Sequence, residues 1–350
     1  MRKILLVLPI LAAVIFLSGC GTSSSTNSSV NLMPAATVIR SDDGGTTWNP
    51  KIKVDDKKTI AGIDILSMVI NPNYPNIIYI GTEANGLFVT KDSGETWQNI
   101  VFANKVYGLI FDPENPDIMY GSGVFNKRAK IYKRIQENQE WKEVYTEPAE
   151  GTTITALAID KTNSQILYAG TSEGVIIKTT DGGLTWVNLR KAAGPVVNIV
   201  FDVANSAHIF FGVFQKGVIE TKDGGINVED ITKKIDPIKN TTTIYTVIAD
   251  PYLPGVIYVG TENGIFRREG NGMWNELNII ESSKSFPTRV ILINPKNSKE
   301  IMYSSAKAIY KSVDGGVKWS TFQLDTAKEI SVLRYDPMDS AKIYAGLRKF

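Results

Sequence analysis

Five aspartates recur in one short motif, and their carboxylates are the groups of this chain best suited to chemistry. The first copy of the motif reads Ser41-Asp42-Asp43-Gly44-Gly45-Thr46-Thr47-Trp48, and the equivalent aspartates are Asp43, Asp92, Asp181, Asp223 and Asp314. A carboxylate in such a turn can bind calcium, act as a catalytic acid or base, or accept hydrogen bonds from backbone N–H groups. Because catalysis needs one such group and not five, the recurrence favours a structural, turn-holding role.

Tryptophan is the last residue of four copies of the motif, and the tryptophans of the chain are regularly spaced. Trp48, Trp97, Trp186 and Trp319 end recognisable copies, whereas the units that end at Trp141 and Trp274 keep only the tryptophan. Glycines in the motif permit positive φ, and each indole offers a large face to bury. The resulting period is about 45 residues.

Two further markers repeat with the same period and define the elements of each unit. Asn or Asp follows a short apolar run at 71, 112, 160, 202, 250, 294 and 336, and an aromatic residue recurs in a run such as Ile78-Tyr79-Ile80-Gly81. Each unit contains four short runs rich in Ile, Val, Tyr and Phe, bounded by Gly, Pro, Asn and Asp, which predicts four strands. Four strands in each repeat are typical of a propeller blade.

The two ends of the domain predict how the ring closes. Residues 332–335 and 342–346 read as a first and a second strand, whereas residues 37–40 and 48–52 read as a third and a fourth. Six complete units and these two halves make seven blades, and pairing the halves leaves no bare sheet edge. We therefore expect an all-β fold, a single seven-bladed β-propeller of four-stranded blades over residues 35–350.

The motif Ser-x-Asp-x-Gly-x-Thr-Trp resembles the BNR repeat, or Asp box, of sialidases, xyloglucanases and sortilin-type receptors. The fuller unit is most similar to photosystem II assembly/stability factor-like propellers and related bacterial proteins. This resemblance covers essentially the whole domain and implies the propeller fold, with boxes on the rim away from the ligand face. It carries no specific activity, because fold does not fix function.

No catalytic constellation is evident in the sequence. His208 is the only histidine and Cys20 the only cysteine, so a His-based metal site or a Ser-His triad is not expected, and no cofactor is expected. A calcium ion held by loop carboxylates stays open. A glycoside hydrolase needs two opposed carboxylates. Glu83, Glu173 and Glu262 recur in the loops between second and third strands, and Asp64 precedes an inner strand. Their recurrence suggests solvated loop positions instead.

The loops that depart from the repeat are the candidates for partner binding. The loop in the third unit, residues 121–128, is enlarged and basic, and the fifth unit carries Val213-Phe214-Gln215-Lys216. We expect Phe125, Arg128, Phe214 and Lys216 to be candidate partner-binding residues on one side of the ring. The alternative is that they are ordinary exposed loop residues.

The first twenty residues read as a targeting signal. Arg2 and Lys3 precede an apolar run that ends in Leu17-Ser18-Gly19-Cys20, which resembles the bacterial lipobox. We expect a signal peptide over 1–19, lipidation of Cys20, and a flexible tether over 20–34. The net charge of +2 gives no field that favours nucleic acid.

Together these features predict a monomeric, extracytoplasmic propeller, anchored to a bacterial membrane by lipid only. We expect a non-catalytic binding or assembly scaffold that holds a protein or glycan partner on its loop face. An Asp-box-type glycoside hydrolase that acts on extracellular polysaccharide is the alternative.

Overall fold

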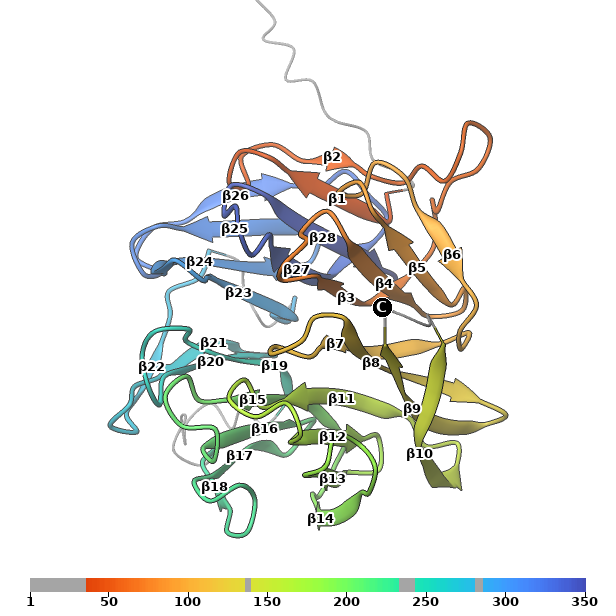
Figure 1. Cartoon of the computed structure of the whole chain (residues 1–350). Helices are drawn as coiled ribbons and strands as arrows, with labels where there is room; N and C mark the ends of the chain where they lie inside the picture. Colours follow the sequence, from red (N-terminus) through yellow and green to blue (C-terminus); the bar gives the residue numbers. More distant parts are fainter. Residues whose placement is uncertain (1–35, 136–139, 233–242, 281–285) are drawn as a thin grey trace, which may run out of the picture. The chain divides into compact units, whose positions relative to one another are not determined.

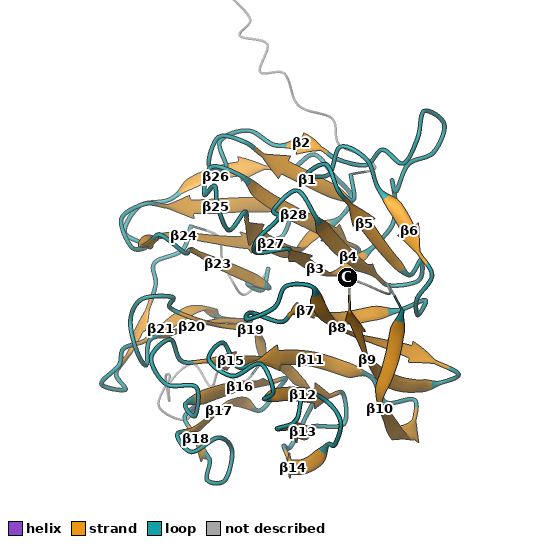
Figure 2. Ribbon diagram, viewed as in Figure 1, coloured by secondary structure: helices purple, strands orange, loops and turns teal. Residues whose placement is uncertain are grey.

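The computed structural model describes residues 36–135, 140–232, 243–280 and 286–350. These residues contain no α-helix and form seven four-stranded antiparallel sheets, arranged as the blades of a β-propeller (Figures 1 and 2). The predicted fold class is therefore confirmed. Residues 1–35, with the predicted signal peptide, Cys20 and tether, lie outside the described residues.

Blades 1 to 4 contain the following strands. Blade 1 consists of β27 (Glu329–Tyr335), β28 (Ile343–Arg348), β1 (Val38–Ser41) and β2 (Asn49–Pro50). Blade 2 consists of β3 (Ile65–Ile70), β4 (Ile78–Thr82), β5 (Leu87–Thr90) and β6 (Gln98–Ile100). Blade 3 consists of β7 (Val106–Phe111), β8 (Ile118–Phe125), β9 (Arg128–Ile135) and β10 (Trp141–Glu150). Blade 4 consists of β11 (Ile154–Ile159), β12 (Leu167–Thr171), β13 (Val175–Thr179) and β14 (Val187–Lys191).

Blades 5 to 7 follow the same order. Blade 5 consists of β15 (Val196–Phe201), β16 (Ile209–Val213), β17 (Gly217–Thr221) and β18 (Glu229–Asp230). Blade 6 consists of β19 (Ile244–Ala249), β20 (Ile257–Thr261), β21 (Gly264–Arg268) and β22 (Trp274–Glu276). Blade 7 consists of β23 (Val290–Asn294), β24 (Asn297–Ser305), β25 (Ala308–Ser312) and β26 (Ser320–Gln323).

The first strand of every blade lies at the centre of the ring. Each of these inner strands contacts the inner strand of the next blade, in the order β27, β3, β7, β11, β15, β19, β23 and back to β27. Blade 1 joins distant parts of the chain, because β1 pairs with β28 in the register Val38↔Gly346 to Ser41↔Ile343. The sequence predicted this pairing from the two half-units.

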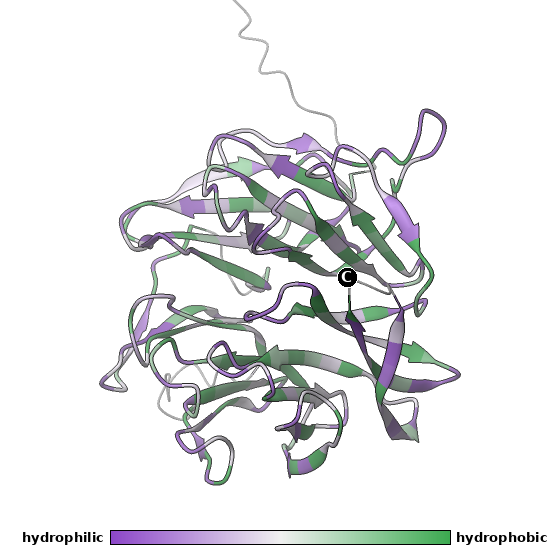
Figure 3. Ribbon diagram, in the orientation of Figure 1, coloured by the Kyte–Doolittle hydropathy of each residue, from purple (hydrophilic) through white to green (hydrophobic). Residues whose placement is uncertain are grey.

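The hydrophobic core lies between blades, where the faces of adjacent sheets meet. Figure 3 shows hydrophobic residues along the strands and hydrophilic residues in many of the connecting loops. Trp97 is 2% exposed and packs with Ile60, Ile65 and Met68 of its own unit and with Val332 and Tyr344 of blade 1. Burial of such faces on both sides of each sheet stabilises the ring.

The Asp boxes are also points at which neighbouring blades are joined. A cation on the third strand of one blade, usually with a tyrosine on its second strand, donates to a carbonyl in the box of the next blade. These contacts are Tyr120 and Lys133 to Gly182 O (3.0 and 3.4 Å), Tyr168 and Lys178 to Gly224 O (2.9 and 3.4 Å), Tyr344 and Arg40 to Ser93 O (3.3 and 2.8 Å), and Lys311 to Gly44 O (2.6 Å).

Blades 3 and 6, which lack the box, are joined to the preceding blade in the opposite direction. Arg134 and Arg268 stand at the position where the box would have its Ser or Thr. Arg134 Nη1 donates to the hydroxyl of Tyr79 in blade 2 (2.7 Å), and Arg268 Nη2 lies 3.1 Å from Glu220 in blade 5. In each blade without a box, an arginine therefore contacts a residue of the preceding blade.

The enlarged loop predicted in the third unit is instead an extended hairpin. β8 and β9 pair as far as Phe125↔Arg128 and are joined by Asn126 and Lys127, both with positive φ. The glycines that suggested a loop are strand residues: a Cβ on Gly121 would lie 3.2 Å from Phe102 and from Trp141. A Cβ on Gly123 would clash with that of Ala103, so close packing requires both glycines and they do not mark a turn.

Candidate functional site

One side of the ring carries the hairpins between second and third strands and the loops that enter the inner strands; we call this side the loop face. The Asp boxes, which join third and fourth strands, lie at the other ends of the strands. In six inner strands the pairing with the second strand slips by one residue, and the bulged residues are Leu66, Tyr107, Thr155, Val197, Tyr245 and Ser331. Each stands five residues before the Asn or Asp marker, and in blade 7 the equivalent residue is Arg289. Bulges of this kind re-aim a side chain out of the ladder.

Aromatic and basic side chains from blades 5, 6, 7 and 1 meet in sequence on the loop face. The ring centroids of Phe214 and Tyr245 lie 5.8 Å apart, edge to face. The Arg289 guanidinium lies 4.8 Å from the centroid of the Tyr245 ring and 4.1 Å from that of Phe350. Arg348 lies 5.2 Å from the same Phe350 ring, which therefore contacts two guanidinium groups. Cation–π contacts of this kind hold the ring in place while 57% of Phe350 stays exposed.

The same run of contacts continues into blades 2 and 3 through charged groups. Arg348 Nη2 lies 3.3 Å from Glu83, and Lys105 pairs with the other oxygen of that carboxylate. The hydrogen bond to Glu83 raises the pKa of Lys105. Lys105 also lies 5.5 Å from the centroid of the Tyr107 ring. We call the eight residues Phe214, Tyr245, Arg289, Phe350, Arg348, Glu83, Lys105 and Tyr107 the loop-face arc.

The structure separates the four residues that the sequence singled out for partner binding. Phe214 is half-buried at one end of the loop-face arc, and Lys216 is exposed on the same hairpin. Phe125 belongs to a different cluster, because its ring packs against Phe102 and Tyr132 at 5.7 and 4.8 Å. Arg128 is exposed, 3.9 Å from Glu150. Among the described residues, the aromatic cluster around Phe125 and the loop-face arc have no member in common.

The carboxylates considered for glycoside hydrolysis have different surroundings in the structure. Glu83 lies between Arg348 and Lys105, and Asp64 lies 3.0 Å from Lys328 Nζ. Glu262 accepts a hydrogen bond from the backbone N–H of Thr243 (3.1 Å), and Glu173 is exposed. Glu83 and Asp64 are thus engaged by cations of the protein, whereas a hydrolase needs two opposed carboxylates that face its substrate.

The five box aspartates accept hydrogen bonds within their own turns. Asp92 Oδ1 accepts from the hydroxyl of Thr90 (2.6 Å) and the N–H of Thr96 (2.9 Å), and its Oδ2 accepts from the Thr96 hydroxyl (2.5 Å). Equivalent bonds surround Asp43, Asp181, Asp223 and Asp314. The Thr47 side-chain hydrogen bond lowers the pKa of Asp43 to about 2, and that of Thr185 does the same for Asp181.

His208 belongs to a charged group between blades 5 and 6. Its Nε2 lies 2.6 Å from Glu220 and its Nδ1 3.7 Å from Asp202. Burial raises the pKa of Glu220, but the hydrogen bond to His208 and the charge of Arg268 outweigh it and leave that pKa below its usual value. The histidine thus has a structural setting inside a blade junction and not a position on the loop face.

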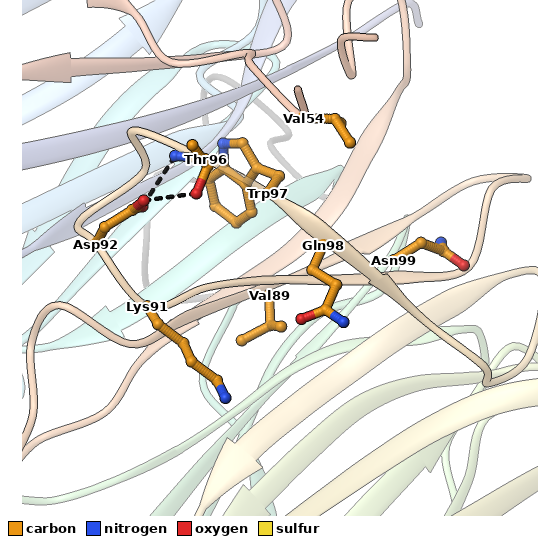
Figure 4. A pocket seen from close by; sticks show the side chains of 8 residues that line it. All are labelled: Val54, Val89, Lys91, Asp92, Thr96, Trp97, Gln98 and Asn99. Atoms are coloured by element: carbon orange, nitrogen blue, oxygen red, sulfur yellow. Dashed lines mark hydrogen bonds between the residues drawn. The ribbon is translucent and has the colours of Figure 1, made fainter. Parts of the chain in front are cut away.

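Outside the loop face, a depression of about 410 Å³ lies along the outer part of blade 2 (Figure 4). Lys91, Asp92, Trp97 and Asn99 line it, and Figure 4 shows Asp92 bonded to Thr96. In the described part of the chain, no group of three or more His, Cys, Asp or Glu side chains is arranged to hold a metal ion. Nor does any helix there have the length and apolarity needed to cross a membrane.

Comparison with known proteins places this architecture. Residues 36–143 match the family described as Sortilin-Vps10 (sortilin, neurotensin receptor 3). Over 136 residues, 37% of this chain, the sequence is 26% identical to an oligoxyloglucan-reducing end-specific xyloglucanase from Emericella nidulans, of which the match covers 16%. The chain thus spans less than a fifth of that relative's length.

Solved structures share the fold at low sequence identity. A GH74 xyloglucanase from Xanthomonas campestris superposes with a TM-score of 0.68 and 15% identity, covering 82% of this chain and 51% of that one. YCF48 from Cyanidioschyzon merolae superposes with a TM-score of 0.61 and 13% sequence identity, and the match covers 81% of this chain and 95% of that one. YCF48 bound to D1 peptide superposes with a TM-score of 0.61 and 14% sequence identity, and the match covers 84% of this chain and 99% of that one. The predicted similarity to sortilin, xyloglucanase and photosystem II assembly factor propellers is confirmed, as a similarity of fold.

Sequence reasoning missed most of the loop-face arc. Tyr245, Arg289, Arg348 and Phe350 were not singled out, because each looks ordinary within its own unit. A signal was present, however: counting five residues back from every Asn or Asp marker collects Tyr107, Tyr245 and Arg289 at one position of the ring. Residues at equivalent positions of the inner strands lie at the same height along the axis of a closed ring.

Proposed function

We propose that this chain is a non-catalytic binding or assembly propeller that holds a partner on its loop face. The observation that supports this most directly is the loop-face arc, in which the Phe350 ring is 57% exposed while two arginines contact it. Exposed aromatic and arginine side chains that are already held in position are the residue types that dominate binding hot spots, because little side-chain entropy is lost on binding.

The chemistry of the arc favours an acidic, aromatic-bearing protein segment as the partner. Arg289, Arg348 and Lys105 outnumber the two carboxylates that pair with them, Glu329 and Glu83, so this surface keeps a net positive charge that attracts an acidic partner. A guanidinium plane or an aromatic ring can also stack on a partner's ring. A glycan is the second partner class, because sugar faces also pack on exposed aromatic rings. Similar folds are known in both settings, since YCF48 was solved with a D1 peptide and the xyloglucanases act on a glycan.

A glycoside hydrolase of the Asp-box type is the alternative function. Its support is the 26% identity to a xyloglucanase, although that match covers only 16% of the enzyme. Against it stand the ion pairs of Glu83 and Asp64, which engage with cations of the protein the carboxylate oxygens that a hydrolase would present to its substrate. Release of reducing sugar from xyloglucan or another polysaccharide, abolished by Glu83→Gln or Asp64→Asn, would establish the enzyme and overturn the binding proposal.

We also propose that lipid on Cys20 anchors the propeller outside the cytoplasm of its bacterial host. The sequence Leu17-Ser18-Gly19-Cys20 after an apolar run supports this. Metabolic labelling with a palmitate analogue should mark the wild type but not Cys20→Ala, and the variant should leave the membrane fraction. An unlabelled wild type would refute the anchor without bearing on the loop face.

A matched pair of variants tests the loop-face proposal. Arg289→Ala/Arg348→Ala removes two positive charges from the arc, and Lys222→Ala/Lys318→Ala removes two from exposed positions near the Asp boxes. Crosslinking in envelope preparations, followed by isothermal titration with the partner found, should show at least tenfold weaker binding for the first variant and none of that loss for the second. Equal losses in both would indicate general electrostatic attraction and contradict a specific loop-face site.

The blade 3 hairpin needs its own variant. Phe125→Ala/Arg128→Ala tests whether the two residues that the sequence singled out extend the binding surface. Because Phe125 packs into an aromatic cluster, the thermal stability of this variant must be measured alongside its binding. Arg128→Ala alone avoids this complication, since that side chain is 44% exposed and its ion pair is long.

A further inference from the structure

The inner strands of the propeller are almost free of charge. Glu329 and Arg334, both in β27, are the only charged residues in the seven inner strands. Glu329 has a partner, because Arg289 Nε lies 3.3 Å from its carboxylate. Among the described residues no carboxylate lies within ion-pair distance of Arg334, so one positive charge at the centre of the ring is uncompensated.

The position of Arg334 is apolar in every other blade. It stands two residues before the marker Asp336, and the equivalent residues are Val69, Ile110, Ala158, Val200, Ile248 and Leu292. Arg334 lies on an inner strand and is exposed to solvent, as expected of a side chain that reaches the water at the centre of the ring. The six equivalent residues are buried or half-buried in the hydrophobic clusters between blades, so Arg334 is the one charged side chain at this position of the ring.

The geometry of the guanidinium leaves one edge available. Arg334 Nη1 donates to the backbone carbonyl of Leu333, its own neighbour, at 2.8 Å. The Nε and Nη2 hydrogens point along the other edge, which is the edge that pairs with two oxygens of a carboxylate, sulfate or phosphate. A backbone carbonyl is neutral, so the bond to Leu333 orients the guanidinium without cancelling its charge.

An unpaired positive charge at the centre of the ring attracts anions. Low-dielectric walls focus the field of a charge into the water that they enclose, which raises the local concentration of counter-ions. We propose that Arg334 is an anion-binding site in the central channel, and that it takes a small oxyanion through its Nε–Nη2 edge. The oxyanion is either a free ion such as sulfate or phosphate, or a carboxylate presented by a partner.

Two other features agree with this site. Desolvation by the surrounding protein lowers the pKa of Arg334, although the side chain keeps contact with solvent, as expected for a cation that has lost part of its hydration without gaining a counter-ion in the protein. Arg334 also lies three residues further along the inner strand than the level of the loop-face arc, roughly 10 Å at the usual rise of a strand. The site is therefore separate from the arc, and the proposal stands whether or not the arc binds a partner.

Thermal unfolding of the full chain in detergent, at constant ionic strength, tests the proposal. Sodium chloride is replaced stepwise by sodium sulfate, sodium phosphate or sodium acetate, and the midpoint is followed in the wild type, Arg334→Met and Arg128→Met. Methionine keeps the length of the side chain without its charge. Arg128 is a matched control because it is an exposed arginine with only a long ion pair.

We expect the wild type and Arg128→Met to gain a midpoint shift that saturates with anion concentration, and Arg334→Met to show no saturating shift. A response to sulfate or phosphate but not to acetate indicates a free ion as the ligand, and the reverse indicates a carboxylate. The same response in Arg334→Met as in the wild type, or no saturating response in the wild type, would overturn the site.

A second measurement applies even if Arg334→Met fails to fold. Arg334→Lys keeps the charge but lacks the planar fork, so the apparent dissociation constant should rise at least tenfold. Crystals soaked in selenate should show an anomalous peak beside Nε and Nη2 in the wild type. Tight binding in the lysine variant, or a peak elsewhere and none at Arg334, would contradict the bidentate site.

Discussion

Arg268 in blade 6 and Glu220 in blade 5 form a buried ion pair across the junction of two blades, with 3.1 Å between Nη2 and Oε1. The side chains are 9% and 3% exposed. Glu220 occupies the place where blades 3 and 4 carry Lys133 and Lys178, which donate to the box of the next blade. The charge at this position is reversed where blade 6 has no box and supplies an arginine instead.

Breaking this pair from one side should be costly. Arg268→Met leaves the Glu220 carboxylate buried with only His208 beside it, and removal of one partner of a buried pair typically costs about 3–5 kcal/mol. The double variant Glu220→Leu/Arg268→Met should cost less than the sum of the two single variants, because it removes both charges and leaves neither unpaired. Chemical denaturation followed by tryptophan fluorescence gives the four free energies of unfolding.

The adjacent arginine provides the control for that measurement. Arg267 pairs with Glu269 at a position where both side chains are about one quarter exposed, 24% and 26%. Arg267→Met should therefore change the free energy of unfolding by no more than about 1 kcal/mol. Equal losses for Arg267→Met and Arg268→Met would show that the inter-blade pair has no special role.

The tryptophans that end the boxes should differ in their contribution to stability. Trp97 is 2% exposed and its Nε1–H donates to the carbonyl of Lys51 at 2.9 Å, whereas Trp186 is only half-buried and contacts Tyr145. Trp97→Ala should cost about 3–5 kcal/mol, the usual range for a fully buried aromatic side chain, and Trp186→Ala clearly less. Urea denaturation of both variants measures the difference, and a larger loss for Trp186→Ala would contradict it.

The repeat pattern predicted the blades because their chemistry is local. A strand needs β-branched and aromatic residues, a box needs Asp and Gly at fixed spacing, and both can be read within one unit of about 45 residues. The pairing of residues 38–41 with 343–348 also followed, since half-units at the two ends can satisfy their edges only together.

The candidate site could not be predicted in the same way, because its contacts run between units. Glu83 and Arg348 are far apart in sequence, and only ring closure places them 3.3 Å apart. The role of Arg268 was hidden for a similar reason: the sequence shows that the box is missing, but not that the replacement reaches into the preceding blade. In blade 3, Gly121 suggested a loop where aromatic packing had removed the side chain.

The aspartates of the boxes should make the folded chain less stable as the pH falls below about 5. The pKa of Asp43 and of Asp181 is about 2 in the folded chain, below the usual value of 3.8. Between these values the unfolded chain binds more protons, so the stabilisation is complete above about pH 5 and is lost as pH falls towards 2. Thermal midpoints recorded by circular dichroism from pH 2 to 6 should show a shallower slope for Asp43→Asn than for the wild type. Asp56→Asn, at a side chain 93% exposed, should keep the wild-type slope.

Deletion of residues 331–350 should abolish the folded propeller. β28 lies between β1 and β27, and Ile343, Tyr344, Ala345 and Leu347 in it are 0% exposed. Without it, β1 and β2 are an isolated two-stranded ribbon, which is marginal in water, and the inner ring loses β27 between β23 and β3. Calorimetry should show no cooperative transition in this variant. Deletion of Lys349 and Phe350 alone keeps every strand and should melt near the wild-type midpoint, so a normal melt for the longer deletion would refute closure through blade 1.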